Sequence, residues 1–312
     1  MAIRDGLIRG FCGLGLVLLA GCTASDPVCK PTPIALMQVH FFHNEPVFDA
    51  TMNGKAVPMM FDTGSEISVI TPQTVARLHI PRLHSRYMTL IGPGGSVRTS
   101  EAFVKQFQMG VAVGVGFKFP VVTLADRHTG LARIGGAIGE DVFHNYDVDI
   151  DFPHRQAFLI SSRHCQVVIP WNGALHPVHF RIAHDGAAEF PITMNGHRVE
   201  AIFDTGSSGN LGSSGTLMNR SLFNDLGLNS DHPQKIREAH GLGIGGYGFH
   251  VAVYRLHDAE IGGVVWRHPI VGVGGDSGEM GSVVIVGESF IRHHEIYISY
   301  PRRTLYVRAA TP

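Results

Sequence analysis

The sequence predicts a mostly β protein made of two homologous lobes. The chain has 312 residues, which is room for two domains. It contains 38 glycines and 17 prolines, the residues that form turns, and few stretches with the periodicity of long amphipathic helices. One segment of the sequence occurs twice, and further segments match in the same order in both halves. Together these observations indicate a duplicated β domain.

The repeated segment covers residues 51–65 and 193–207, which are identical at ten of fifteen positions. Both copies end in Phe-Asp-Thr-Gly-Ser, and each places one aspartate, Asp62 or Asp204, directly after a short apolar run. A turn of this kind in each half can bring two carboxylates to one point. The simpler interpretation is a duplicated strand and turn without chemical significance.

The match between the halves continues beyond this segment. Residues 137–140 read Ala-Ile-Gly-Glu, and residues 285–288 read Ile-Val-Gly-Glu. A short helical pattern follows each, and then a strand, a proline turn and a returning strand. We therefore expect an N-terminal lobe over residues 37–165, a linker over 166–174 and a C-terminal lobe over 175–312.

Each half also carries a glycine-rich segment between its aspartate and its late glycine. Glycine provides the positive φ angles that tight hairpins need. We expect two mobile hairpins that can cover a site, with these glycines at their tips: Gly94, Gly95, Gly245 and Gly246. An ordinary surface hairpin is the alternative for either one alone.

Two carboxylates in contact can hydrolyse an amide without a metal ion. Like charges at contact do not both ionise easily, so the pair shares one proton. The ionised member then takes a proton from water while the protonated member donates one to the carbonyl group. Asp62 and Asp204 are the candidates for this pair. We expect the threonines to bond across the lobes, the glycines to allow close backbone approach and the serines to hold the outer carboxylate oxygens. These supporting residues are Thr63, Gly64, Ser65, Thr205, Gly206 and Ser207.

At these residues the chain resembles the pepsin and retropepsin aspartic peptidases. The resemblance consists of Asp-Thr-Gly-Ser after apolar residues and a later apolar-apolar-Gly strand, and it covers about 37–165 and 175–309. It implies two β-barrel lobes with an active-site cleft between them, Asp62 and Asp204 as the catalytic pair, and flaps over a bound peptide. It also implies that no cofactor and no metal is needed. The lobes are shorter than those of pepsin, and a flap candidate occurs in each half.

Residues 1–21 are typical of a bacterial secretion signal. Arg4 and Arg9 precede an apolar core that is too short to span a membrane. The core ends in Leu-Ala-Gly-Cys at residues 19–22, which resembles the lipobox of bacterial lipoproteins. This resemblance implies a lipid on Cys22, a tether over residues 22–36 and a place on the periplasmic side of the envelope. The outer membrane is favoured over the inner one because Thr23, and not an aspartate, follows the cysteine. An ordinary cleavable signal is the alternative.

Cys29 and Cys165 remain after removal of the signal and lipidation of Cys22. The periplasm is oxidising, so a disulfide between them is one possibility, and two free thiols are the other.

Other functional classes are poorly supported by the sequence. The net charge of −1 provides no basic field for nucleic acid. Residues 241–246 match GxGxxG, but a β pattern follows where a dinucleotide site needs a helix. Residues 275–278 read Gly-Asp-Ser-Gly without the flanking residues of a serine protease. The pairs His40/His43 and His293/His294 lack a third ligand at a recognisable spacing.

We therefore expect a monomeric, membrane-anchored aspartic endopeptidase that acts on a peptide or protein. A peptide-binding lipoprotein of the same fold that does not cleave is the leading alternative. Retention of both aspartates and both Thr-Gly-Ser sequences argues against it, because binding alone requires no pair of ionisable groups.

Overall fold

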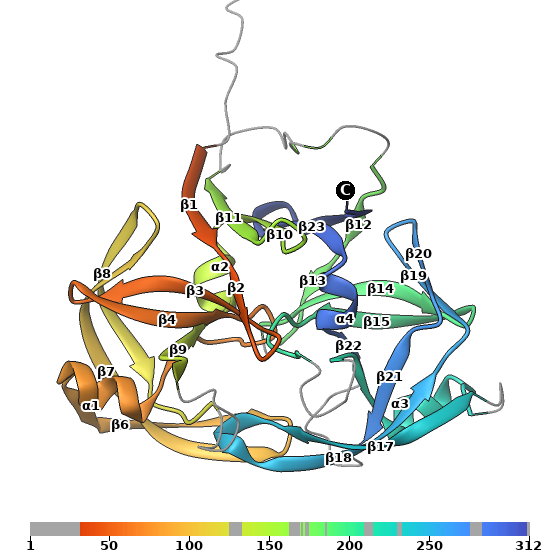
Figure 1. Ribbon diagram of the computed structural model, residues 1–312, viewed down its shortest axis with the longest axis horizontal. Helices are drawn as coiled ribbons and strands as arrows, with labels where there is room; N and C mark the ends of the chain where they lie inside the picture. Colours follow the sequence, from red (N-terminus) through yellow and green to blue (C-terminus); the bar gives the residue numbers. More distant parts are fainter. Residues whose placement is uncertain are drawn as a thin grey trace, which may run out of the picture.

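The computed structural model consists of two β lobes joined by a sheet to which both contribute (Figure 1). The mostly β fold with two homologous lobes is confirmed. The described residues are 32–124, 133–161, 169, 171, 175–184, 186–208, 215–229, 233–274 and 283–310. The predictions for Cys22, Cys29 and Cys165 lie outside these residues, as does the Gly-Asp-Ser-Gly segment at 275–278. No helix in the described part of the chain is long and apolar enough to cross a membrane.

The N-terminal lobe is an eight-stranded sheet with the central order β5-β9-β4-β3-β7-β6. Two further strands extend it, since β2 pairs with β3 and β8 pairs with β7. Its elements are β2 (His40–Phe42), β3 (Glu45–Met52), β4 (Lys55–Phe61), β5 (Val69–Ile70), α1 (Pro72–Leu78), β6 (Arg82–Gly92), β7 (Gly95–Met109), β8 (Ala112–Pro120), β9 (Gly136–Ile138) and α2 (Glu140–Phe143).

The C-terminal lobe is a ten-stranded sheet with the order β17-β18-β21-β16-β22-β15-β14-β19-β20, and β13 pairs with β14. Its elements are β13 (Arg181–Ile182), β14 (Ala188–Met194), β15 (His197–Phe203), β16 (Leu217–Asn219), α3 (Arg220–Asp225), β17 (Gln234–Leu242), the 3-10 helix η3 (Ile244–Gly246), β18 (Gly248–Arg255), β19 (Asp258–Ile261), β20 (Val264–Arg267), β21 (Ile270–Gly274), β22 (Val284–Val286) and α4 (Glu288–Ile291).

The third sheet, here called the shared sheet, has six strands in the order β1-β11-β10-β23-β24-β12. Its elements are β1 (Thr32–Gln38), β10 (Asp147–Asp151), β11 (Gln156–Ser161), β12 (Val178–His179), β23 (His294–Ser299), the 3-10 helix η5 (Tyr300–Arg302) and β24 (Thr304–Ala309). The two halves of the chain meet where β10 pairs antiparallel with β23.

The shared sheet changes two expectations about domain boundaries. Residues 32–36, expected to be part of a tether, are the first five residues of β1 and pair with β11. The strand pairs expected at the end of each lobe, β10–β11 and β23–β24, form one sheet instead of closing two separate units. Backbone hydrogen bonding therefore continues from one half of the chain into the other.

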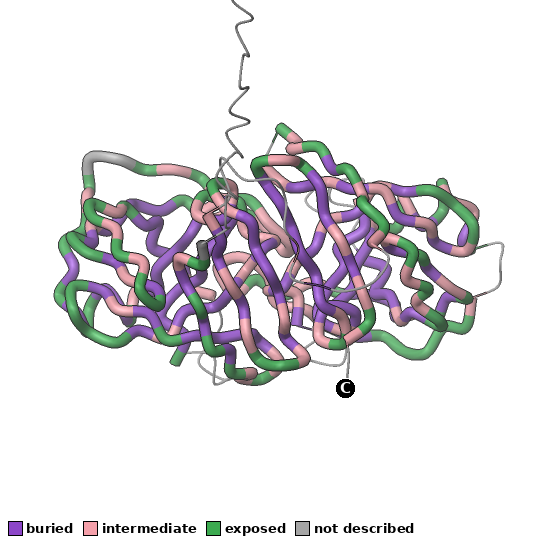
Figure 2. The backbone as a smooth tube through the Cα atoms, turned by 90° about the horizontal axis from the view of Figure 1, so that it is seen from above, coloured by how far each residue is buried: buried purple, intermediate pink, exposed green. Residues whose placement is uncertain are grey.

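One face of the shared sheet packs into the main hydrophobic core. Val148 and Ile150 of β10 lie opposite Ile298 and Ile296 of β23, and all four are at most 2% exposed. Side chains alternate between the faces of a strand, so the aspartates of β10 lie on the opposite face. Figure 2 shows that buried residues run through the strands of both halves, while exposed residues gather at the turns. The core is thus continuous between the lobes.

The duplication is visible in the strands that lead to Asp62 and Asp204. β4 runs parallel to β9 in the first half, and β15 runs parallel to β22 in the second. The N–H group of Asp62 donates to the carbonyl oxygen of Ile138, and that of Asp204 donates to the carbonyl oxygen of Val286, both at 3.0 Å. The apolar run before each aspartate therefore lies beside the apolar-apolar-Gly strand of its own half, as the sequence match predicted.

Candidate active site

Asp62 and Asp204 follow β4 and β15 and lie against each other. A Cβ atom placed on Gly64 would lie 2.2 Å from Cγ of Asp204, and one on Gly206 would lie 2.7 Å from Cγ of Asp62. The glycine of each motif is thus packed against the carboxyl group of the other motif. Any other residue at these positions would push the two carboxyl groups apart.

Thr63 and Thr205 form a reciprocal set of hydrogen bonds across the lobes. The N–H group of Thr63 donates to Oγ1 of Thr205 at 3.0 Å, and the N–H group of Thr205 donates to Oγ1 of Thr63 at 3.2 Å. Each hydroxyl group donates in turn to a carbonyl oxygen of the other half, from Thr63 to Phe203 at 2.8 Å and from Thr205 to Phe61 at 2.5 Å. Both threonines are almost fully buried, so the predicted contact across the lobes is present and shielded from water.

The serines contribute through their backbone and not through their hydroxyl groups. The hydroxyl of Ser65 donates to the carbonyl oxygen of Ile67 at 2.8 Å, and that of Ser207 donates to the carbonyl oxygen of Gly215 at 2.5 Å. The prediction that these hydroxyls hold the carboxylates is therefore wrong, because they close the loops that follow. Backbone amides take this role, including the N–H group of Gly64, which lies 3.1 Å from Oδ1 of Asp62.

The late glycine of each half packs behind its own aspartate turn. A Cβ atom on Gly139 would lie 2.3 Å from the carbonyl oxygen of Ser65, and one on Gly287 would lie 2.6 Å from that of Ser207. The N–H groups of the next residues, Glu140 and Glu288, donate to the same serine carbonyls at 2.8 and 3.0 Å. The apolar-apolar-Gly sequence is required here because the crossing strand touches the turn that carries the carboxylate.

The glutamates after these glycines link the two lobes, Glu140 directly and Glu288 through Arg292. Oε1 of Glu140 accepts hydrogen bonds from the N–H group of Ala188 at 3.4 Å and the hydroxyl of Tyr300 at 3.3 Å. Glu288 pairs with Arg292 at 2.5 Å, and the guanidinium group of Arg292 lies 4.2 Å from the centre of the Phe41 ring. Each half thus braces the other close to the aspartate pair.

The surroundings of the pair favour a shared proton. Burial raises the pKa of Asp62 well above its ordinary value, and the nearby charges of Asp204 and Glu45 raise it further. Burial also raises the pKa of Asp204, to about 6, while the backbone amides of Gly206 and Ser207 and a hydrogen bond from Asp62 lower it. These directions favour one proton shared by the pair, held more strongly by Asp62 than by Asp204. As whole residues, Asp62 and Asp204 are intermediate between buried and exposed.

Glu45 is a third acidic group at this site that the sequence analysis missed. It is the first residue of β3, is 7% exposed, and its Oε1 accepts a hydrogen bond from the hydroxyl of Ser208 at 2.7 Å. The repeat offset places Ala187 in the corresponding position of the second half, so Glu45 has no counterpart there. The further acidic charge that raises the pKa of Asp204 comes from Glu140, at a different place in the fold. Comparison of the two halves residue by residue, upstream of the repeated segment, would have revealed this difference.

The two glycine hairpins meet at their tips. The first is formed by β6 and β7 and the second by β17, η3 and β18, and they run toward each other along the lower edge of Figure 1. The N–H group of Ile244 donates to the carbonyl oxygen of Pro93 at 3.1 Å. The four glycines expected at the tips have positive φ angles, as the turns require: Gly94 (87°), Gly95 (148°), Gly245 (69°) and Gly246 (78°). Their role as flaps over a peptide remains a prediction.

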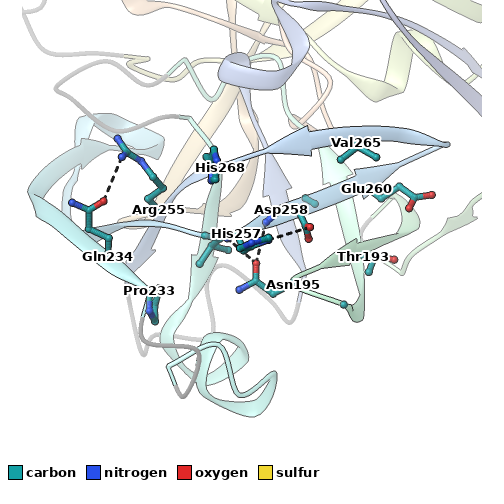
Figure 3. A pocket seen from close by; sticks show the side chains of 13 residues that line it. Thr193, Asn195, Pro233, Gln234, Arg255, His257, Asp258, Glu260, Val265 and His268 are labelled. Carbon is teal, nitrogen blue, oxygen red and sulfur yellow. Dashed lines mark hydrogen bonds and ion pairs between the residues drawn. The ribbon is translucent and has the colours of Figure 1, made fainter.

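A surface hollow on the C-terminal lobe is separate from the aspartates (Figure 3). It lies where the strands of the second half are interrupted, between β18 and β19 and between β20 and β21, whereas β7 and β8 of the first half run without a break. Asn195 accepts the N–H group of His257 at 2.9 Å, and Arg255 donates to Gln234 at 3.3 Å. These hydrogen bonds join lining residues to one another, and neither Asp62 nor Asp204 lines the hollow.

The remaining sequence candidates do not assemble into sites in the described residues. Residues 241–246 lie at the tip of a β hairpin, and a strand follows them where a dinucleotide site would need a helix. Neither His40 and His43 nor His293 and His294 belong to a group of three potential metal ligands in the described part of the chain.

The pairing of one carboxylate from each half of a duplicated β chain, joined through Thr-Gly turns, defines the class of aspartic proteases. A family model described as aspartyl protease matches residues 48–139 and 190–290, which is more than half of the chain. The protein therefore belongs to the aspartyl protease family, and the predicted resemblance is confirmed. The two matched regions contain Asp62 and Asp204, one each. No curated protein sequence matches the chain.

Replacement of Thr205 by alanine should destabilise both lobes together. The change leaves the buried N–H group of Thr63 and the buried carbonyl oxygen of Phe61 without their partner. Each such loss costs about 1–3 kcal/mol, so we expect the free energy of unfolding to fall by about 3 kcal/mol in urea titrations. Thr205→Ser keeps the hydroxyl group and should lose much less. Equal losses in the two variants would contradict a stabilising role of the hydroxyl.

Proposed function

We propose that the protein is an aspartic endopeptidase that hydrolyses peptide bonds with a water molecule activated between Asp62 and Asp204. The contact of these two carboxyl groups through reciprocal Thr63 and Thr205 bonds is the observation that carries the proposal. A binding protein needs no such contact, because burying two acidic groups together costs stability.

The geometry supports a direct general acid–base reaction. The ionised carboxylate of Asp204 accepts a proton from water as the water oxygen attacks the substrate carbonyl carbon. Asp62 donates its proton to the carbonyl oxygen, which gives a neutral tetrahedral diol. Asp204 then gives its proton to the nitrogen while Asp62 takes a proton from one diol hydroxyl. The C–N bond breaks, the amine and the carboxylic acid are released, and the pair returns to its starting protonation. The threonine bonds hold the carboxyl groups in place, which matters because a misplacement of about 1 Å is costly in such sites.

The hairpins suggest how a peptide is held. Their tips are joined by the hydrogen bond from Ile244 to Pro93, which must break if a polypeptide is to pass between them. Closure over a bound peptide would exclude bulk water from the aspartates. The proposed substrate is accordingly an extended peptide or protein segment. One chain supplies both aspartates, so we propose that it acts as a monomer without a cofactor.

Hydrolysis should depend on both aspartates. We expect the full-length protein to cleave members of a mixed peptide library between acid and neutral pH, with product ends identified by mass spectrometry. Asp62→Asn and Asp204→Asn should each lower kcat/KM by at least about a thousandfold, because each removes one proton-transfer group. Glu66→Gln, which changes an exposed carboxylate beside the first motif, should retain activity.

Two results would reject the catalytic pair. One is undiminished cleavage by either asparagine variant. The other is peptide binding by folded wild-type protein without cleavage at any pH, which would identify a peptide-binding protein of the same fold.

The pH profile should depend on Glu45. Its negative charge raises the pKa of Asp62, so its removal makes the shared proton easier to lose. The proton is needed for donation to the carbonyl oxygen, and its loss sets the alkaline limit of activity. We therefore expect Glu45→Gln to move the alkaline limb of kcat/KM to lower pH, as measured with one cleaved peptide. Glu66→Gln serves as the control, and an unchanged limb in Glu45→Gln would show that Glu45 does not act on the pair.

We further propose that the protein is held at the periplasmic side of a bacterial membrane, with the outer membrane favoured, by a lipid on Cys22. The lipobox-like sequence at residues 19–22, at the end of a short apolar core, supports this proposal. A lipid anchor would leave both lobes facing the periplasm, where envelope proteins are available as substrates.

Anchoring should require Cys22 specifically. Cys22→Ser should abolish labelling by radioactive palmitate and move the protein from the membrane fraction to the soluble fraction. Cys29→Ser, which changes a cysteine outside the lipobox-like sequence, should keep both label and membrane association. Membrane association of unlabelled Cys22→Ser would instead indicate an anchor of another kind.

A further inference from the structure

The face of the shared sheet turned away from the main core carries a row of acidic residues. Asp147, Asp149 and Asp151 alternate along β10 and so lie on one face. The same face of β23 carries Glu295, Tyr297 and Ser299, with Tyr297 opposite Asp149 and Ser299 opposite Asp147. β10 and β23 lie side by side between the two lobes in Figure 1.

One end of this row is fully satisfied by neighbouring side chains. Asp147 accepts hydrogen bonds from the hydroxyl of Tyr297 at 2.8 Å and the hydroxyl of Ser299 at 2.6 Å. The guanidinium group of Arg302 lies 3.4 Å from Oδ2 of Asp147. The charge and the lone pairs of this buried carboxylate therefore have protein partners.

The other end of the row brings together an aspartate, a histidine and a glutamate. One potential ligand atom from each of Asp151, His154 and Glu295 lies within 4.8 Å of the others. Nδ1 of His154 is 2.7 Å from Oδ1 of Asp151. Asp151 ends β10 and His154 lies in the turn that joins β10 to β11 in the first half, and Glu295 belongs to β23 in the second. These three residues are called the Asp151 cluster below.

Carboxylate oxygens at this end are left without hydrogen bonds. Glu295 is 4% exposed, and its Oε2 pairs with Arg308 at 2.5 Å, but its buried Oε1 has no hydrogen-bond partner. Asp149 is 6% exposed, and its buried Oδ1 also has none. Buried polar atoms are nearly always satisfied in native proteins, so such oxygens indicate a group that the polypeptide does not supply.

The charge at this end favours a cation. Asp149, Asp151 and Glu295 provide three carboxylates, and Arg308 neutralises one of them. The guanidinium group of Arg308 is also held 4.7 Å from the centre of the Trp171 ring. It is thus fixed on the Oε2 side of Glu295, which leaves the carboxylate of Asp151, beside His154, for a further cation.

We propose that Asp151, His154 and Glu295 bind one divalent transition-metal ion of the zinc class. A set of one imidazole and two carboxylates suits zinc and its neighbours better than calcium or magnesium, which prefer oxygen ligands alone. Ligands of a tetrahedral zinc ion lie about 3.3 Å apart, since each is about 2.0 Å from the metal. Nδ1 of His154 lies 2.7 Å from Oδ1 of Asp151, so the half-exposed His154 side chain would have to move outward to reach this spacing. A water molecule completes the fourth position.

The ion would be structural. It would join the β10–β11 turn of the first half to β23 of the second half across the shared sheet. The ion takes no part in the hydrolysis proposed above, and the two proposals can fail independently.

The test is zinc binding by full-length protein that has been stripped with a chelator and dialysed. Isothermal titration with zinc chloride should show one tight site per chain, and Tm should rise by about 5 °C at a zinc concentration a hundredfold above Kd. Cobalt should bind at the same site and give the visible absorption of a tetrahedral ion. His154→Ala, which alters a half-exposed turn residue, should weaken binding at least about tenfold, and Glu295→Gln should do the same.

Matched variants separate this site from adventitious binding by the 19 histidines of the chain. His293→Ala and Glu260→Gln change exposed residues outside the Asp151 cluster and should leave zinc affinity and the Tm shift unchanged. The proposal is overturned if the wild-type protein shows no stoichiometric tight site. It is equally overturned if His154→Ala binds zinc with wild-type affinity.

Discussion

The contact between two carboxyl groups that would otherwise repel each other is the constraint on which the structure depends. Two buried aspartates stay together only if they share a proton and if surrounding groups hold them there. The Thr63–Thr205 bonds provide this restraint at the contact itself, and Glu140 and Arg292 provide it one layer outward. The shared sheet provides it at the scale of the whole molecule. Each lobe is therefore braced against the other at three distances from the aspartates.

Much of this arrangement was predictable because the sequence contains two copies of the same domain, which can be aligned with each other. The repeated Phe-Asp-Thr-Gly-Ser segment identified both strand ends that carry aspartate, and the late glycines identified the strands that cross behind them. The glycines of the hairpin tips were identified because positive φ angles restrict the choice of residue. In each case a local steric requirement restricts which residues can occupy the position, so the residue found there indicates the local structure.

Other features depend on long-range pairing, which leaves little trace in one sequence. The pairing of β10 with β23 joins residues about 150 positions apart, and their alternating pattern would fit a lobe that ends by itself. The hydroxyls of Ser65 and Ser207 had two possible partners, and only the loop geometry decides between them. The Asp151 cluster joins an Asp-x-x-His turn to a distant glutamate, so no spacing rule could select it.

Glu45 occurs in only one half of the chain, and this asymmetry affects how a substrate can lie across the two halves. A site with perfect two-fold symmetry cannot distinguish the two directions in which a polypeptide can lie across it, because rotation exchanges its aspartates. A peptide chain has a direction, however, and its reversal exchanges the residues that face each lobe. Ala187 stands where symmetry would place a second glutamate, so rotation no longer reproduces the site. In the proposed reaction Asp62 is the proton donor, so the enzyme can select the amino-to-carboxyl direction in which a peptide lies across the pair.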